Sequence, residues 1–346
     1  MVDFRDLNDT ESSNGDETSS SETPIRFRDL EAAPGRIEDA DQNARDKTMK
    51  ALYDEACGYL HEVFEAAGDR RTFALAPGQR IVEQWVDAYP ADDVLFMLAI
   101  HKDRQYDLRI DHSVNVAILA VKLGRGLGFE REELVRLGLA ALLHDVGTAM
   151  IPERILKKKE PLTDDEFKIL RERPKYSYRI LRSLEETHGY LADLAVQVYE
   201  RADGSGYPQG LKAEDIHEYA QIIGLVDFYE ALIHNRPQRE KYLHFSAVKK
   251  IIKTAKSCYG RRHLKALLTT FSLFPVFSYV RLNSNAIGKV IETYQDQPMR
   301  PRLKIVYDSQ SRKVLTDRFV NLPENPLLYI VESVSEASLE SMVPDA

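Results

Sequence analysis

Two histidines and two aspartates stand at positions where helical periodicity turns each of them inward. They are His112, His144, Asp145 and Asp227. Residues three, four, seven or eleven positions apart share one face of a helix, and apolar residues hold those positions here. The apolar neighbours are Val116, Leu119 and Leu123 for His112, Leu137, Ala140 and Ala141 for His144, and Ile223 and Ala231 for Asp227.

The chemistry open to such a set is metal binding. A lone inward histidine is usually a hydrogen-bonded core residue, whereas a buried aspartate must be paired or bound to a cation. Nitrogen and oxygen ligands together suit one divalent transition metal, namely Fe, Mn, Zn, Ni or Co. From spacing alone, a metal site and a hydrogen-bonded core cluster stand as equal alternatives.

The elements that would position these residues are mainly helical. Apolar residues recur at three and four over residues 46–105, where Pro77-Gly78 separates two helical stretches and the second carries Trp85. Helical periodicity continues over 106–275. Short β-branched segments bounded by turns then predict a small antiparallel sheet over 276–336, followed by a tail over 337–346. The fold class is therefore mainly α, a helical bundle with an N-terminal helical region and a C-terminal β appendage.

Composition narrows the function. The 346 residues carry a net charge of −8, which argues against general nucleic-acid binding. Only two cysteines are present, so we do not expect a disulfide framework. We expect a cytoplasmic location, where cysteines stay reduced. The longest apolar runs, such as Leu137 to Leu143, are too short to span a membrane, and the N-terminus has no signal-peptide pattern.

Residues 1–45 are acidic, polar and poor in apolar groups, which predicts a disordered tail. A Phe-Arg-Asp-Leu element occurs twice in it, at Phe4–Leu7 and Phe27–Leu30. These copies and the N-terminal helices are candidate contacts for protein partners. Chance recurrence in a biased segment is the simpler reading of the repeat.

Two longer motifs carry a family resemblance. Leu143-His-Asp-Val-Gly147 resembles the signature of HD phosphohydrolases, and Glu200-Arg-Ala-Asp-Gly-Ser-Gly-Tyr-Pro208 resembles the second signature of the HD-GYP family. Ile151-Pro152, Gly210-Leu211 and Arg236-Pro237 also fall at the family's spacings. The resemblance covers roughly residues 106–239. It implies an all-α HD-type domain, a bacterial signalling role, cyclic di-GMP phosphodiesterase activity and two or three bound metal ions.

The chain departs from that family in one part of the site. By the resemblance, His112, His144, Asp145 and Asp227 correspond to the ligands of one metal, and all four are present. The second metal is held in the family by three histidines that are Arg173, Val198 and Tyr199 here, and a substrate-binding lysine is Thr148. The resemblance therefore implies at most one metal ion.

Other family positions are present. Arg173 replaces a histidine with a positive charge that could pair with Asp145 or hold a phosphate, or it could point to solvent. Arg201 and Lys158 are further phosphate-binding candidates, and Asp145 and Arg201 would be the catalytic residues of an active enzyme. The GYP loop comprises Asp203, Gly204, Gly206, Tyr207 and Pro208.

Three hypotheses remain open at this stage. The first is a degenerate HD-GYP protein that is impaired or inactive as a phosphodiesterase and acts as a regulatory module sensing cyclic di-GMP or another cyclic dinucleotide. The second is an active phosphohydrolase that uses one metal. The third is a structural or partner-binding protein.

Overall fold

The structure is a computed structural model that describes residues 40–88, 94–101, 107–184, 188–294 and 296–340. The predicted tail therefore lies outside the described residues up to residue 39. Its boundary at 45 is too late, because the first helix begins at Ala40. The helices preceding the HD motif are α1 (Ala40–Gly68), α2 (Ala76–Asp87), α3 (Val94–His101), α4 (Leu108–Gly126) and α5 (Arg131–Leu143).

A short 3-10 helix, η3 (Val146–Met150), follows α5 directly. The remaining helices of the bundle are α6 (Glu153–Leu156), α7 (Asp164–Leu170), α8 (Arg173–Arg182), α9 (Gly189–Ala195), α10 (Glu218–Ile233), α11 (His244–Ala255) and α12 (Arg261–Thr270). The mainly helical fold class predicted from the sequence is confirmed.

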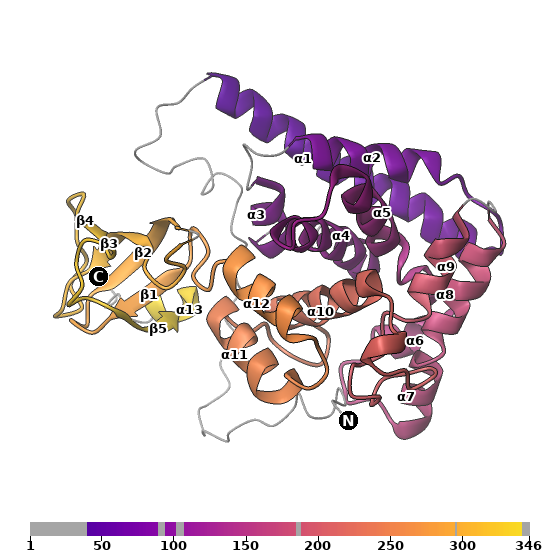
Figure 1. The fold of residues 1–346 in the computed structure, drawn as a ribbon. Helices are drawn as coiled ribbons and strands as arrows, with labels where there is room; N and C mark the ends of the chain where they lie inside the picture. The colour runs from indigo at the N-terminus through magenta and orange to yellow at the C-terminus, as the bar shows by residue number, and fades with distance from the viewer. Residues whose placement is uncertain (1–39, 89–93, 102–106, 185–187, 295, 341–346) are drawn as a thin grey trace.

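The centre of the bundle is α4, which packs against α1, α3, α5, α10 and α12 (Figure 1). It is buried on all sides from Ile110 to Val121, so even its polar residues Asp111, His112, Ser113 and Asn115 lie inside the bundle. Local signals set the ends of the central helices. The side chain of Asp107 accepts a hydrogen bond from the Arg109 amide at the start of α4, and Glu130 and Glu133 form a capping box at the start of α5.

The C-terminal region is an antiparallel sheet beside α11 and α12 (Figure 1). Its strands are β1 (Tyr279–Leu282), β2 (Ile287–Glu292), β3 (Arg302–Tyr307), β4 (Phe319–Asn321) and β5 (Ile330–Val334), in the order β4-β3-β2-β1-β5. The first three coincide with the β-branched segments Val276–Leu282, Gly288–Thr293 and Leu303–Tyr307 within the predicted range 276–336. The other two were not predicted, because β4 is very short and β5 (Ile-Val-Glu-Ser-Val) shows weak alternation.

The end of the chain also differs from expectation. A short helix, α13 (Glu336–Glu340), occupies the start of the predicted tail, and residues 341–346 lie outside the described residues. None of the described helices combines the length and apolar character that crossing a membrane requires.

Candidate metal centre

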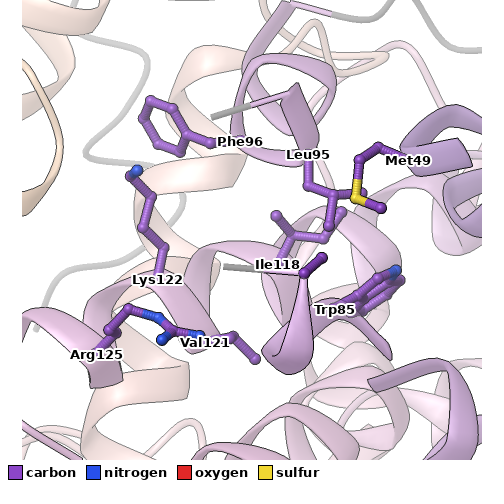
Figure 2. Close-up of a pocket in the computed structure, with 9 residues that line it drawn as sticks. Met49, Trp85, Leu95, Phe96, Ile118, Val121, Lys122 and Arg125 are labelled. Carbon is purple, nitrogen blue, oxygen red and sulfur yellow. The ribbon is translucent and has the colours of Figure 1, made fainter. Parts of the chain in front are cut away.

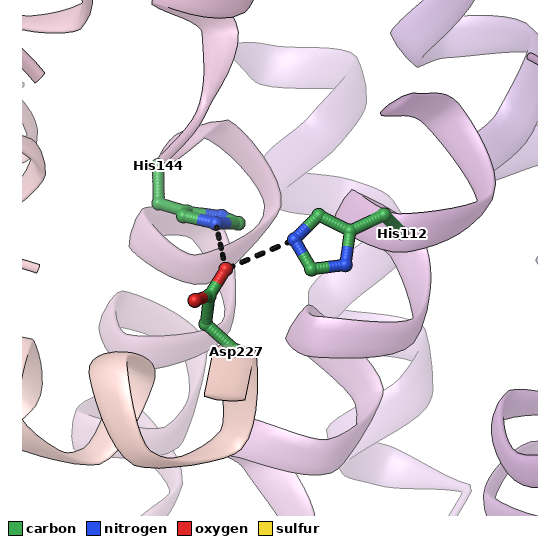
Figure 3. A group of neighbouring side chains, drawn as sticks. All are labelled: His112, His144 and Asp227. Atoms are coloured by element: carbon green, nitrogen blue, oxygen red, sulfur yellow. Dashed lines mark hydrogen bonds and ion pairs between the residues drawn. The ribbon is translucent and has the colours of Figure 1, made fainter. Parts of the chain in front are cut away.

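Three of the four predicted metal ligands meet between α4, the end of α5 and α10 (Figure 3). His112 Nε2 lies 2.9 Å from Asp227 Oδ1, and His144 Nε2 lies 3.4 Å from the same oxygen. All three side chains are buried, and a ligand atom from each lies within 4.8 Å of the others. These atoms form a set that could hold one metal ion.

The hydrogen bonds of His144 fit a ligand. Its Nδ1 lies 2.7 Å from the carbonyl oxygen of Ala141, so Nδ1 carries the proton and donates. The lone pair of Nε2 then faces Asp227, and among the described residues Nε2 has no hydrogen-bond partner although the side chain is fully buried. An unsatisfied buried nitrogen beside a carboxylate is the arrangement that a cation would complete. A bound ion would polarise a phosphate ester and lower the pKa of its bound water.

His112 is oriented by a residue that sequence reasoning missed. Its Nδ1 hydrogen-bonds Glu230, a fully buried carboxylate three residues after Asp227 on α10. Glu230 also accepts from Arg236 Nη2 at 2.8 Å and from Asn115 Nδ2 at 3.2 Å. The signal in the sequence is its spacing of three from Asp227, which places both acids on one face of an otherwise apolar helix.

The electrostatics follow from these contacts. Burial by itself opposes charge on each group, but Glu230 and Asp227 together hold the pKa of His112 above its ordinary value. Burial likewise acts to raise the pKa of Asp227, but the hydrogen bond with His112 Nε2 and the two neighbouring imidazoles lower it well below its usual range. Asp227 is therefore an ionised carboxylate at neutral pH, the form that binds a metal.

Asp145, the fourth predicted ligand, is not part of the three-residue group. Its Oδ1 accepts a hydrogen bond from the Tyr199 hydroxyl at 3.0 Å, and its Oδ2 lies 3.5 Å from Arg173 Nη1. The Arg173 side chain is only 11% exposed, so it does not point to solvent, and it pairs with Asp145 as one of the sequence-based alternatives had it. Burial raises the pKa of Tyr199, which keeps the hydroxyl protonated and able to donate.

Aromatic stacking connects this pair to the GYP loop. The Arg173 guanidinium lies 4.0 Å from the centre of the Tyr199 ring. Tyr199 in turn stacks on Tyr207, with centroids 5.4 Å apart and planes 8° apart. Arg171 covers the Tyr207 ring at 4.6 Å. Two arginines and two tyrosines thus fill the space next to Asp145.

The GYP loop is held by its own polar groups. Asp203 accepts hydrogen bonds from the backbone and side chain of Ser205, at 3.0 and 2.6 Å, and from Ser257 at 3.1 Å. Gly204 adopts a φ of +79°, and a Cβ on Gly206 would lie 2.4 Å from the backbone of Glu200 and Arg201. Asp203, Gly204 and Gly206 therefore determine the conformation of the loop. Pro208 follows Tyr207 through a cis peptide bond.

The predicted phosphate-binding residues have protein partners. Arg201 Nη1 donates to the carbonyl oxygens of Val198 at 3.1 Å and Glu200 at 2.7 Å. Lys158 Nζ donates to Glu166 at 2.6 Å. Thr148, at the position of the family's lysine, is buried, and its hydroxyl has no hydrogen-bond partner in the part of the chain that the structure describes. A separate pocket lined by residues of α1, α2, α3 and α4 (Figure 2) contains none of these residues.

Two stretches of the chain match known domain families. Residues 97–262 match the HD domain family, and residues 279–342 match a KOW domain associated with the HD domain. The chain is 34% identical over 197 residues to the cyclic di-GMP phosphodiesterase PdeB of Borreliella burgdorferi. The aligned stretch covers 57% of this chain and 52% of that protein.

Further relatives agree. The chain is 30% identical to the cyclic di-GMP phosphodiesterase PA4108 of Pseudomonas aeruginosa, over 61% of this chain and 51% of that one. It is 29% identical to the 3'3'-cGAMP-specific phosphodiesterase 1 of Vibrio cholerae, over 57% of this chain and 44% of that one. Among solved structures, Bd1817, an HDG"Y"P protein from Bdellovibrio bacteriovorus, shares the fold with a TM-score of 0.53 at 18% identity, covering 64% of this chain and 71% of that one.

Residues 97–262 therefore form an HD domain. This domain is similar to those of the cyclic di-GMP phosphodiesterases named above, and its second signature, Glu200–Pro208, resembles that of the HD-GYP family. The family resemblance stated from the sequence is confirmed. The chain spans about half the length of the curated relatives it matches.

Proposed function

We propose that this protein binds one divalent transition metal at His112, His144 and Asp227, with Asp145 as the fourth ligand, and that it is impaired or inactive as a cyclic di-GMP phosphodiesterase. Its function is then that of a regulatory module that senses a cyclic dinucleotide. The relatives are named as phosphodiesterases of cyclic di-GMP or cGAMP, which supports this ligand class.

The observation that carries the proposal is the environment of Asp145. Arg173 and Tyr199 stand where the family has histidine ligands of a second metal, and both hydrogen-bond Asp145. Val198, the third replacement, is fully buried and has no ligand atom in its side chain. A guanidinium neutralises a carboxylate but cannot make a hydroxide nucleophile from water, so a mechanism that needs two metals loses one of them.

A second candidate is an active phosphohydrolase that uses the single remaining metal. The observation in its favour is that the three-residue group is intact, with an ionised Asp227 and a buried, unpartnered His144 Nε2. Arg173 or Arg201 would then stabilise the phosphate of the transition state, and Asp145 would take part in catalysis.

The experiment is a measurement of metal content per chain, paired with assays of cyclic di-GMP binding and hydrolysis. The protein is expressed in medium supplemented with iron, manganese and zinc, and wild type is compared with His144→Ala. The exposed His61→Ala serves as the matched control. We expect one metal per wild-type chain, loss of that metal in His144→Ala alone, and binding of the dinucleotide with little or no turnover.

The outcomes separate the two functions. Hydrolysis at an ordinary enzymic rate that is abolished by His144→Ala would overturn the regulatory proposal and support the single-metal enzyme. A wild-type protein without bound metal would contradict both.

A further inference from the structure

The N-terminal helix α1 reaches the candidate metal centre although it lies outside the HD domain match. That match begins at residue 97, whereas α1 ends at Gly68. Tyr53, on the buried face of α1, is 1% exposed, and its hydroxyl donates a hydrogen bond to Asn115 Oδ1 at 2.9 Å. Asn115 belongs to α4 and lies three residues after His112.

The contact continues to the metal ligand. Asn115 Nδ2 donates to Glu230 Oε1 at 3.2 Å, and the other oxygen of Glu230 holds His112 Nδ1. Four side chains from α1, α4 and α10 thus form one hydrogen-bonded chain from Tyr53 to His112. Each member is buried, with Glu230 and Tyr53 exposed by 0% and 1%.

The direction of each hydrogen bond matters for His112. Because the Tyr53 hydroxyl donates to the amide oxygen of Asn115, the amide nitrogen must face Glu230. The Glu230 carboxylate then accepts from both Asn115 and His112, which keeps a proton on His112 Nδ1. In the structure Nε2 hydrogen-bonds Asp227 Oδ1 at 2.9 Å, and with the proton held on Nδ1 it is Nε2 that would give up its proton to bind a metal.

We infer that Tyr53 is a positioning residue for the metal centre, acting through Asn115 and Glu230 on the orientation and tautomer of His112. The N-terminal helical region is then a part of the metal site, and a change in the packing of α1 alters metal affinity. This inference rests on the metal binding proposed above. It adds a residue that touches neither the metal nor a substrate.

The test compares two conservative substitutions on the same helix. Tyr53→Phe removes only the hydroxyl of the chain. Tyr59→Phe is the matched control, because Tyr59 is also on α1 and its hydroxyl donates to the backbone of Ala74 at 3.1 Å, away from the site. The dissociation constant of Mn²⁺ or Zn²⁺ is measured by competition with a chelator, and thermal unfolding without metal reports the integrity of each fold.

Loss of a residue that orients a metal ligand weakens metal binding by about 10- to 100-fold, which is our expectation for Glu230→Gln. Tyr53 acts one step further away, so Tyr53→Phe is expected to weaken binding by roughly 3- to 10-fold. Tyr59→Phe should bind as wild type does. The ¹⁵N chemical shifts of the His112 ring should show a mixed tautomer in Tyr53→Phe without metal.

The results distinguish the two proposals. If wild type and Tyr53→Phe bind metal equally, or if both tyrosine variants weaken binding to the same degree, the positioning role is wrong and the metal site stands. If wild type binds no metal, the metal site itself is wrong, and the role of Tyr53 falls with it.

Discussion

The hydroxyl of Tyr199 donates a hydrogen bond to Asp145 at 3.0 Å, and the same ring lies beneath the guanidinium of Arg173. By the family resemblance, Asp145 corresponds to a metal ligand, and positions 173 and 199 correspond to ligands of a second metal. A buried carboxylate needs a compensating partner. Here the hydrogen bond and the positive charge come from the protein itself, which is why we expect a single ion.

Restoring the three histidines should restore a second metal. The triple variant Arg173→His, Val198→His and Tyr199→His removes the protein partners of Asp145 and supplies three imidazole ligands. We expect metal content to rise from one to two ions per chain, measured by inductively coupled plasma mass spectrometry. Tyr199→Phe alone is the control, since it removes the hydrogen bond without adding a ligand and should stay at one ion. A triple variant that folds and still binds one ion would contradict this account of the site.

Metal should stabilise the folded chain through Asp227. A ligand that binds only the folded state adds about 2.7 kcal/mol of stability at one hundred times its dissociation constant. We therefore expect the Tm of wild type to rise on adding Mn²⁺ or Zn²⁺, and the Tm of Asp227→Asn to remain unchanged. Asp193→Asn, an exposed carboxylate on α9, should respond as wild type does. Differential scanning calorimetry provides the measurement, and an equal rise in Asp227→Asn would place the metal elsewhere.

The GYP loop should depend on Glu200. This buried side chain accepts hydrogen bonds from the backbone N–H groups of Gln209 at 2.6 Å and Leu211 at 3.0 Å. In Glu200→Gln, one of these donors faces an amide NH₂ group, which should cost about 1–3 kcal/mol of unfolding free energy. Urea unfolding measures the loss, and amide hydrogen exchange should quicken at the two donors. The exposed Glu214→Gln is the control, and unchanged exchange in Glu200→Gln would contradict the prediction.

His101 should make the fold sensitive to mild acid. Burial, with smaller contributions from Lys241 and other nearby cations, lowers its pKa to about 4, while its ring Nε2 lies 3.0 Å from the carbonyl oxygen of Val276. Because the folded pKa is depressed, the unfolded chain binds the proton more readily between about pH 6.5 and 4. Stability should therefore fall as the pH decreases through this window, by on the order of 2–3 kcal/mol.

The measurement is the urea midpoint of wild type and His101→Gln at pH 7 and pH 5. The glutamine amide can still donate to Val276, so the variant should lose less stability between the two pH values than wild type. His61→Gln, at an exposed position, should behave as wild type does. Equal losses in all three proteins would show that His101 does not carry the effect.

The GYP loop and the strands show which features local sequence patterns predict and which they do not. The glycine-rich run from Asp203 to Pro208 predicts a tight loop, and the structure has one, since Gly204 adopts a positive φ and Gly206 approaches neighbouring backbone. Strands with β-branched residues between turns, such as Leu303–Tyr307, could be located from the sequence as well. In contrast, β5 pairs with β1 about fifty residues earlier in the chain, and no local pattern encodes that partner.

The sequence by itself determined the helical class, the resemblance to HD-GYP proteins and the inward direction of His112, His144 and Asp227, because helical periodicity and linear motifs are local properties. The tertiary structure decided how the polar groups pair. Glu230 holds His112 across 118 residues of chain, and Tyr199 holds Asp145 across 54. Such partners depend on which helix faces pack together, and the cost of leaving a buried polar group unpaired then selects them.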